Sequence, residues 1–200
     1  TYSTSVADVD GDGYMDIVVG NYNQENQVLF GSADGRTFSE FALPGGSMST
    51  TSTSVADVDG DGYMDIVVGN YNQESQILFG SADGRTFSEF ALPGGNMYTS
   101  STSVADVDGD GYMDIVVGNY NQENQILFGS ADGRTFSEVA LPGGSMRTSS
   151  TSVADVDGDG YMDIVVGNDG QENQVLFGSA DGRTFSEVAL PGGRRTRSTS

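Results

Sequence analysis

The 200-residue sequence contains no cysteine, histidine, tryptophan or lysine. Without cysteine and histidine it has no disulfides, no thiolate or imidazole metal ligands, and no nucleophile that depends on either residue. These absences argue against zinc and exclude most familiar hydrolase centres. No apolar run approaches the roughly 20 residues of a membrane span, and the first residues lack the basic and apolar regions of a signal peptide.

Positive charge is also scarce. Eight arginines stand against 29 acidic residues, which gives a formal net charge of −21. This balance argues against nucleic acid or an anionic membrane as partner and favours cations. Sixteen of the acidic residues lie in four Asp-x-Asp-Gly-Asp-Gly-x-x-Asp runs, so the charge is concentrated in loops. Four bound divalent cations would bring the formal charge from −21 to −13.

The chain consists of four copies of one 49-residue unit, with nothing inserted or lost between them. The string Ser5-Val6-Ala7-Asp8-Val9-Asp10-Gly11-Asp12-Gly13 recurs from Ser54, Ser103 and Ser152, and the first two copies differ at only five of 49 positions. Units of this size bury their apolar faces against their neighbours. We therefore treat residues 1–200 as a single propeller or half-propeller with units 5–53, 54–102, 103–151 and 152–200.

Each copy alternates short β-rich segments with turn clusters and lacks any helical apolar pattern. In the first copy we expect strands at about residues 4–9, 14–19, 27–30 and 37–43. A tight turn is expected at Ser32-Ala33-Asp34-Gly35. We expect Pro44-Gly45-Gly46 to end the fourth strand and to begin a Ser/Thr-rich crossing to the next copy.

Apolar side chains occupy both faces of the second expected strand, Met15-Asp16-Ile17-Val18-Val19, beyond its aspartate. Such a strand needs a neighbouring sheet on each side. Four-stranded units that recur every 40 to 50 residues or so are typical of blades around an axis. The expected fold class is therefore all-β, a β-propeller built from four-stranded antiparallel blades with four near-identical blades per chain. A parallel β-helix with calcium turns is the alternative.

The acidic loop that opens each copy predicts a calcium site. Carboxylates stand at positions 1, 3, 5 and 9, a tyrosine backbone carbonyl is available at position 7, and two glycines allow a tight backbone path. This all-oxygen set suits Ca²⁺ better than Mg²⁺, and Val19 at position 12 departs from an EF-hand. The alternative is a polar turn without metal. With one Ca²⁺ per blade and four per chain, the expected ligands are Asp8, Asp10, Asp12, Tyr14 and Asp16; Asp57, Asp59, Asp61, Tyr63 and Asp65; Asp106, Asp108, Asp110, Tyr112 and Asp114; Asp155, Asp157, Asp159, Tyr161 and Asp163.

Residues 6–21 read VADVDGDGYMDIVVGN and are followed by Leu29-Phe30-Gly31. This pattern resembles the FG-GAP (VCBS-type) repeat family of integrin α-subunits, of fungal and bacterial lectins and of many secreted proteins, and it covers all four copies. The resemblance implies a propeller of roughly seven blades with calcium between a blade's first two strands. It also implies a secreted or cell-surface location for a natural chain. Because the four copies are near-identical and fewer than usual, we expect a fragment of a longer array or an engineered repeat.

The segment Asn21-Tyr22-Asn23-Gln24-Glu25-Asn26 offers amides beside an aromatic ring, a composition that suits a sugar; a polar turn is the alternative. The fourth copy has Asp169-Gly170 in place of the tyrosine and asparagine, so we expect its site to be weak or inactive. The expected ligand-binding residues are Tyr22, Asn23, Tyr71, Asn72, Tyr120 and Asn121.

An arginine follows the Asp-Gly turn in every copy, and we expect it to pair with a local acid such as Glu40. The four arginines are Arg36, Arg85, Arg134 and Arg183.

These features favour a non-catalytic calcium-binding scaffold with multivalent carbohydrate (lectin) activity. A purely structural or designed self-assembling repeat, with no ligand except calcium, is the alternative. An acid-based glycosidase is disfavoured because nearly every candidate aspartate is assigned to calcium. Four blades at the pitch of a seven- or eight-bladed ring cover about half a circle. We therefore expect a homodimer that completes an eight-bladed ring, in preference to a closed four-bladed monomer.

Overall fold

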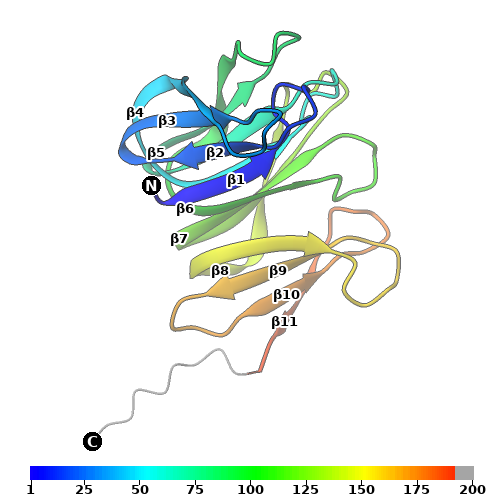
Figure 1. Ribbon diagram of the computed structural model, residues 1–200. Helices are drawn as coiled ribbons and strands as arrows, with labels where there is room; N and C mark the ends of the chain where they lie inside the picture. The colour runs from blue at the N-terminus through cyan, green and yellow to red at the C-terminus, as the bar shows by residue number, and fades with distance from the viewer. Residues whose placement is uncertain (192–200) are drawn as a thin grey trace, which may run out of the picture.

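The computed structural model describes residues 1–191 (Figure 1). The last nine residues of the expected fourth unit, 152–200, lie outside the described part. Residues 1–191 form eleven strands and no helix, and they therefore contain no helix that could span a membrane. The strands are β1 (Ser3–Ala7), β2 (Asp16–Gly20), β3 (Tyr22–Phe30), β4 (Ser39–Ala56), β5 (Asp65–Phe79), β6 (Ser88–Ala105), β7 (Asp114–Phe128), β8 (Ser137–Ala154), β9 (Asp163–Asn168), β10 (Gln174–Phe177) and β11 (Ser186–Ala189).

Each strand pairs antiparallel with the next, in the order β1 to β11. The registers divide this ladder into four successive sheets: β1 to β4, β4 to β6, β6 to β8, and β8 to β11. The long strands β4, β6 and β8 each serve two sheets. In β4, residues 39–49 pair with β3 and residues 50–56 pair with β5. The expectation of an all-β, antiparallel chain is confirmed.

The prediction that Pro44-Gly45-Gly46 ends a strand is wrong. Strand β4 continues through it, because the partner strand holds the segment on both sides: Glu25 pairs with Ser47, and Gln27 pairs with Ala42. Residues 43–46 thus bulge out opposite a single residue, and a bulge tolerates proline, which has no N–H to donate. The turn expected at residues 32–35 is present, closed by a 2.8 Å hydrogen bond from the Gly35 N–H to the Ser32 carbonyl.

Strand β3 begins at Tyr22, not at residue 27 as expected, so the Asn-Tyr-Asn segment lies largely in a strand. In the second and third copies β5 and β7 cover the residues equivalent to β2 and β3 together. Asn23, Asn72 and Asn121 adopt left-handed conformations, with φ of 55°, 55° and 58°. The fourth copy places Gly170 there, also left-handed with φ 68°, although in that copy the segment lies between β9 and β10 and not in a strand.

The core lies between consecutive sheets, where three apolar clusters recur. Alternate side chains of β5 point to opposite neighbours. Ile66 and Val68 pack in the cluster shared with the first copy, and Val67 packs in the cluster shared with the third. This confirms that the strand is covered on both faces and explains why its apolar residues are consecutive.

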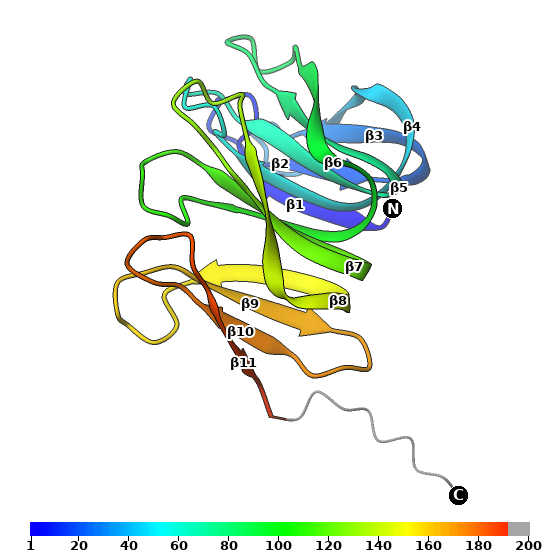
Figure 2. The same ribbon diagram turned by 180° about the vertical axis from the view of Figure 1, so that it is seen from behind.

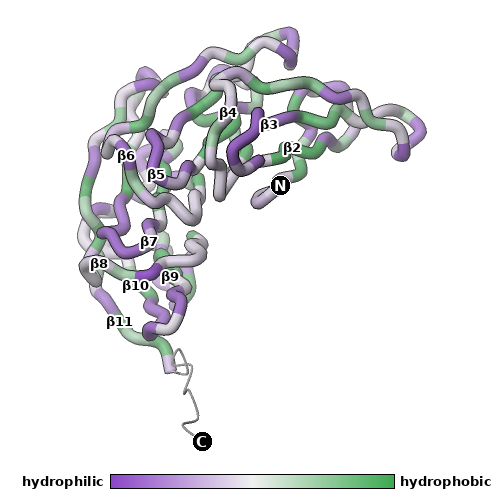
Figure 3. Tube along the Cα trace, turned by 90° about the vertical axis from the view of Figure 1, so that its left-hand side faces the viewer, coloured by the Kyte–Doolittle hydropathy of each residue, from purple (hydrophilic) through white to green (hydrophobic). Residues whose placement is uncertain are grey.

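The four sheets succeed one another around a curved path, with β1 near one end and β11 at the other (Figures 2 and 3). Among the described residues the ladder is not closed, because β1 and β11 stand at opposite ends of the strand order. Each acidic loop lies at one end of its sheet, since Ala7 pairs with Asp16 across the first loop. The tyrosine segment lies at the opposite end, where Ser3 pairs with Gly20.

Candidate metal centre

The acidic loop of the first copy spans residues 8–15, between β1 and β2. Its carboxylates are placed by the loop's own backbone: the Gly13 N–H donates to Asp8 Oδ2 (2.9 Å), and the Tyr14 N–H donates to Asp12 Oδ1 (2.9 Å). Gly11 and Gly13 have φ of 71° and 90°, a left-handed path that side chains rarely adopt. The Asp/Gly spacing therefore turns the carboxylates toward one side of a tight loop.

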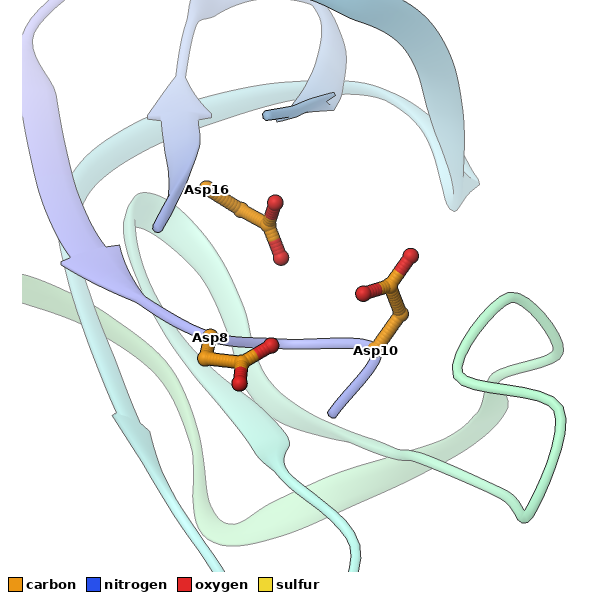
Figure 4. Close-up of side chains that lie close together, drawn as sticks. All are labelled: Asp8, Asp10 and Asp16. Carbon is orange, nitrogen blue, oxygen red and sulfur yellow. The ribbon is translucent and has the colours of Figure 1, made fainter. Parts of the chain in front are cut away.

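Three carboxylates in every copy bring one oxygen each within 4.8 Å of the others, as Asp8, Asp10 and Asp16 do in Figure 4. In the second copy the third carboxylate of the triplet is that of Asp61, at position 5 of the loop, and not that of Asp65, at position 9. Asp12, Asp65, Asp110 and Asp159 lie in the same loops but outside these triplets. The tyrosines at position 7 are exposed, and their backbone carbonyls are the predicted ligands. The other three triplets are Asp57, Asp59 and Asp61; Asp106, Asp108 and Asp114; and Asp155, Asp157 and Asp163.

The last aspartate of the loop ties it to the rest of the sheet. Asp16 is fully buried and accepts hydrogen bonds from the N–H groups of Val9 (2.7 Å) and Gly31 (2.8 Å). A Cβ at Gly31 would lie 2.4 Å from the Met15 carbonyl oxygen, which explains the glycine after β3.

Burial opposes ionisation of these aspartates. It raises the pKa of Asp16, and it raises the pKa of both Asp65 and Asp114 to about 6, although backbone N–H donors act in the opposite direction. A nearby cation would favour the ionised form.

Two observations show that the residues fit a hard divalent cation. The Oδ1 atoms of Asp8 and Asp57 are buried and have no hydrogen-bond partner. A buried carboxylate oxygen without a donor is costly, and so is a set of three clustered carboxylates without a positive charge. An oxygen-only donor set of this kind suits Ca²⁺.

The first three loops are also held by the following copy. Arg85 donates to Asp10 Oδ2 at 2.9 Å, and its guanidinium lies 4.2 Å from the ring centroid of Phe30. Gly84 approaches so closely that a Cβ there would lie 2.3 Å from the Asp10 Cβ. Equivalent pairs join Arg134 to Asp59 (2.8 Å) and Arg183 to Asp108 (2.7 Å).

The expectation of a local salt bridge is therefore wrong for Arg85, Arg134 and Arg183. Stacking of the sheets carries each arginine over the preceding loop, and Glu40 accepts a hydrogen bond from Gln27 instead. This contact between copies was not predicted from the sequence. The Asp-Gly-Arg turn that recurs in every copy was the feature that could have indicated it.

The polar segment at the other end forms a row of aromatic rings. Tyr22 lies 5.2 Å from Tyr2 and 6.4 Å from Tyr71, and Tyr71 stacks on Tyr98 at 4.5 Å. In the third copy the guanidinium of Arg147 lies 6.0 Å from the Tyr120 ring centroid.

The asparagines of this segment have mainly structural contacts. Buried Asn26 accepts from the Asn21 N–H and donates to the Thr50 hydroxyl, both at 2.8 Å. Asn23 accepts from the Ser49 hydroxyl at 2.8 Å. A cavity of about 510 Å³ beside Asn72 is lined by Met48, Glu74, Gln76, Glu89 and Asn96 among others. The structure thus brings Tyr22 and Tyr71 together, and it places Tyr22, Tyr71 and Tyr120 in strands and not in a loop.

The sequence pattern of the FG-GAP-like repeat matches residues 8–68, 57–117 and 106–166. No curated protein sequence matches the chain. Among solved structures, the chain is similar to two crystal structures of BBS1N in complex with ARL6DN, soaked with lead and with mercury. Their identities are 14% and 13%, and both have a TM-score of 0.64 and cover 95% of this chain. This chain spans 57% of the BBS1N chain.

A third similar structure is the V. cholerae biofilm matrix protein Bap1, with 20% identity and a TM-score of 0.45, covering 94% of this chain and 38% of that one. The likeness to BBS1N supports a β-propeller-like fold.

Proposed function

Because the chain belongs to the FG-GAP-like repeat family, we propose that it is a non-catalytic binding scaffold whose four acidic loops each hold one Ca²⁺. The observation that carries this proposal is the convergence of three carboxylates within 4.8 Å at the same place in every copy. Asp8, Asp10, Asp12, Asp16 and the Tyr14 carbonyl would hold the ion of the first copy, and the equivalent residues would hold the others.

Bound calcium would supply the positive charge that the clustered carboxylates lack. The chain's own residues do the rest. Asp16 links the loop to β1 through Val9 and to the end of β3 through Gly31. Arg85 links the loop to the following sheet. Ion binding is thereby coupled to the stability of the loop and of two neighbouring sheets.

Calorimetric titration and thermal melting test the metal proposal. We expect four Ca²⁺ per chain, a clear preference over Mg²⁺, and a lower melting temperature in excess EDTA. Asp57→Asn should reduce the stoichiometry to three. Asp169→Asn removes the same charge from an exposed position outside the loops and should leave four sites. Absence of binding heat, with a melting temperature that EDTA does not change, would refute the proposal.

We propose carbohydrate binding along the tyrosine row as the scaffold's ligand function. Tyr22 and Tyr71 are partly exposed, and Asn72, the residue after Tyr71, lines the 510 Å³ cavity. Aromatic faces next to amides suit sugar rings. Tyr71→Ala should weaken binding on a glycan array. Tyr63→Ala is the matched control, since Tyr63 is 41% exposed against 42% for Tyr71 but lies in an acidic loop. A flat array for the unmodified chain would favour the purely structural repeat.

A protein ligand is the second candidate. The BBS1N structures are of a complex with ARL6DN, which favours protein recognition on a similar scaffold. We propose a secreted or cell-surface location. Extracellular calcium-binding modules have dissociation constants of about 0.1 to 1 mM for their ion, and either a glycan or a protein ligand would be available there.

The proposed assembly is a homodimer in which two open ladders close into one eight-bladed ring. The argument for it is that neither end of the ladder is paired within the described residues. A closed ring would cover both ends at once.

A further inference from the structure

Consecutive copies meet through one repeated contact. In the first of these contacts Val9, Val18 and Phe30 of the first copy pack against Ile66 and Leu78 of the second. Equivalent residues form the second and third contacts. Each copy therefore has a trailing face, which contacts the next copy, and a leading face, which contacts the previous one.

The same residues are uncovered at the two ends of the chain. On the leading face of the first copy, Val6 is 64% exposed and Phe38 is 44% exposed. On the trailing face of the fourth copy, Val156 is 50% exposed, whereas its equivalent Val9 is 3% exposed. Ile17 is half-buried, although its equivalent Ile66 is completely buried.

These two end faces are complementary, because they are copies of surfaces that already pack together inside the chain. The leading face of the first copy matches that of the second residue for residue. Among the apolar cluster residues of the trailing face, the fourth copy differs from the first only in Val188, which stands in place of Phe41, and the third copy already has a valine, Val139, at that position. A second chain of this sequence therefore fits both end faces.

Polar groups repeat the same complementarity. Thr53 contacts the hydroxyls of Ser3 and Ser5 at 3.0 and 2.9 Å across the first contact. Their end equivalents are all exposed: Thr4 on the leading face, and Ser150 and Ser152 on the trailing face.

The charged pair is the most specific element. Asp10, Asp59 and Asp108 each receive an arginine from the following copy. Asp157 holds the same position in the fourth copy, and Arg36 is the arginine of the first. Across residues 1–191 neither of them has an ion pair. Among the described residues the fourth acidic loop thus lacks the arginine that holds the other three.

We propose that two chains dock head to tail through these end faces, and that Arg36 of one chain pairs with Asp157 of the other chain. The inference rests on the proposed homodimer and deepens it, but it does not require bound calcium or glycan. The contact repeats the internal one, with apolar burial for affinity and the ion pair for register. Two such contacts, related by a two-fold axis, leave no end face open.

Sedimentation equilibrium of the full chain tests this. The unmodified protein should sediment with twice the 20.9 kDa mass of a single chain. Arg36→Glu should raise the dimer dissociation constant by at least about tenfold, because it places like charges together. Arg36 belongs to no acidic loop, so this effect would not arise from a lost metal ligand.

Asp157→Arg should weaken the dimer similarly, and the double variant R36E/D157R should regain most of the affinity, although the fourth calcium ligand stays absent. Arg147→Glu, an exposed charge reversal away from the end faces, is the control and should leave the mass unchanged. A dimer that ignores R36E, or one that the double variant fails to restore, would overturn the ion pair. A 20.9 kDa species at micromolar concentration would overturn both the pair and the homodimer. Neither result bears on calcium stoichiometry, so a failure of the metal proposal would be separate.

Discussion

At the scale of single residues, one carboxylate organises the turn after β5. Asp83 accepts hydrogen bonds from the Thr86 hydroxyl (2.6 Å) and from the N–H groups of Arg85 (2.8 Å) and Thr86 (2.7 Å). These donors hold the pKa of Asp83 well below its ordinary value of 3.8. The same arrangement lowers the pKa of Asp34, Asp132 and Asp181.

A carboxylate with a lowered folded-state pKa contributes stability above its unfolded pKa, and the contribution is lost as the pH falls through the folded value. We therefore expect the melting temperature to fall on acidification below about pH 4. Asp83→Asn should lower the melting temperature at neutral pH and make its acid dependence weaker. Asp169→Asn, which removes an exposed carboxylate from no such turn, should leave the pH profile unchanged. Identical pH profiles for Asp83→Asn and the unmodified chain would contradict this role.

The left-handed residue Asn72 in β5 allows a second prediction. Asn72 has a φ of 55°, and glycine already stands at the equivalent position of the fourth copy. Asn72→Gly should therefore change the free energy of unfolding little. Asn72→Ala should cost about 1 to 2 kcal/mol, because alanine lacks a side chain that supports this conformation. Urea denaturation of both variants is the measurement, and equal losses would show that backbone conformation is not the cause.

At the scale of strands, burial on both faces sets the stability. Ile115 in β7 is completely buried in the cluster between the second and third sheets. Ile115→Ala should lower the free energy of unfolding by about 2 to 5 kcal/mol, through lost burial and the cavity left behind. Val139→Ala, at a position 40% exposed, should cost much less. Denaturant titration compares the two, and similar losses would argue against a tightly packed contact between sheets.

The strands show which features sequence could reveal. Consecutive apolar residues such as Ile66, Val67 and Val68 correctly indicated a strand between two sheets, because the pattern is local. The path through Pro44 was missed, because pairing with β3 on both sides of the bulge overrides the local turn signal.

The same distinction holds for the candidate site. Carboxylates within one loop could be expected to converge, since nine residues carry them all. The arginine contacts could not, because Arg85 and Asp10 are 75 residues apart and meet only through the stacking of sheets.

At the scale of the whole molecule, identical copies do not have identical surroundings. Three acidic loops are held by an arginine of the next copy, and within residues 1–191 the fourth loop has no such arginine. Copies with nearly the same sequence therefore differ in the exposure and ion pairing of their residues at the two ends of the ladder. An association that gives every copy the same surroundings must cover the apolar end faces and also provide an arginine for Asp157.

This gives a prediction that depends on concentration. Ile66 and Ile17 are equivalent isoleucines, but Ile66 is buried inside the chain and Ile17 lies on the leading face. Ile66→Ala should lower the melting temperature at every protein concentration. Ile17→Ala should have a small effect in dilute solution, where single chains predominate, and a larger one when a second copy covers the face.

Thermal melting at about 1 and about 100 µM would measure the difference, since association shifts stability by mass action. At the higher concentration the loss from Ile17→Ala should approach that from Ile66→Ala, because the two side chains would then occupy equivalent contacts. Arg36→Glu should remove this concentration dependence from the Ile17→Ala comparison, because it weakens the covering contact. A loss from Ile17→Ala that stays constant over the hundredfold range would mean that the leading face is not covered by another copy.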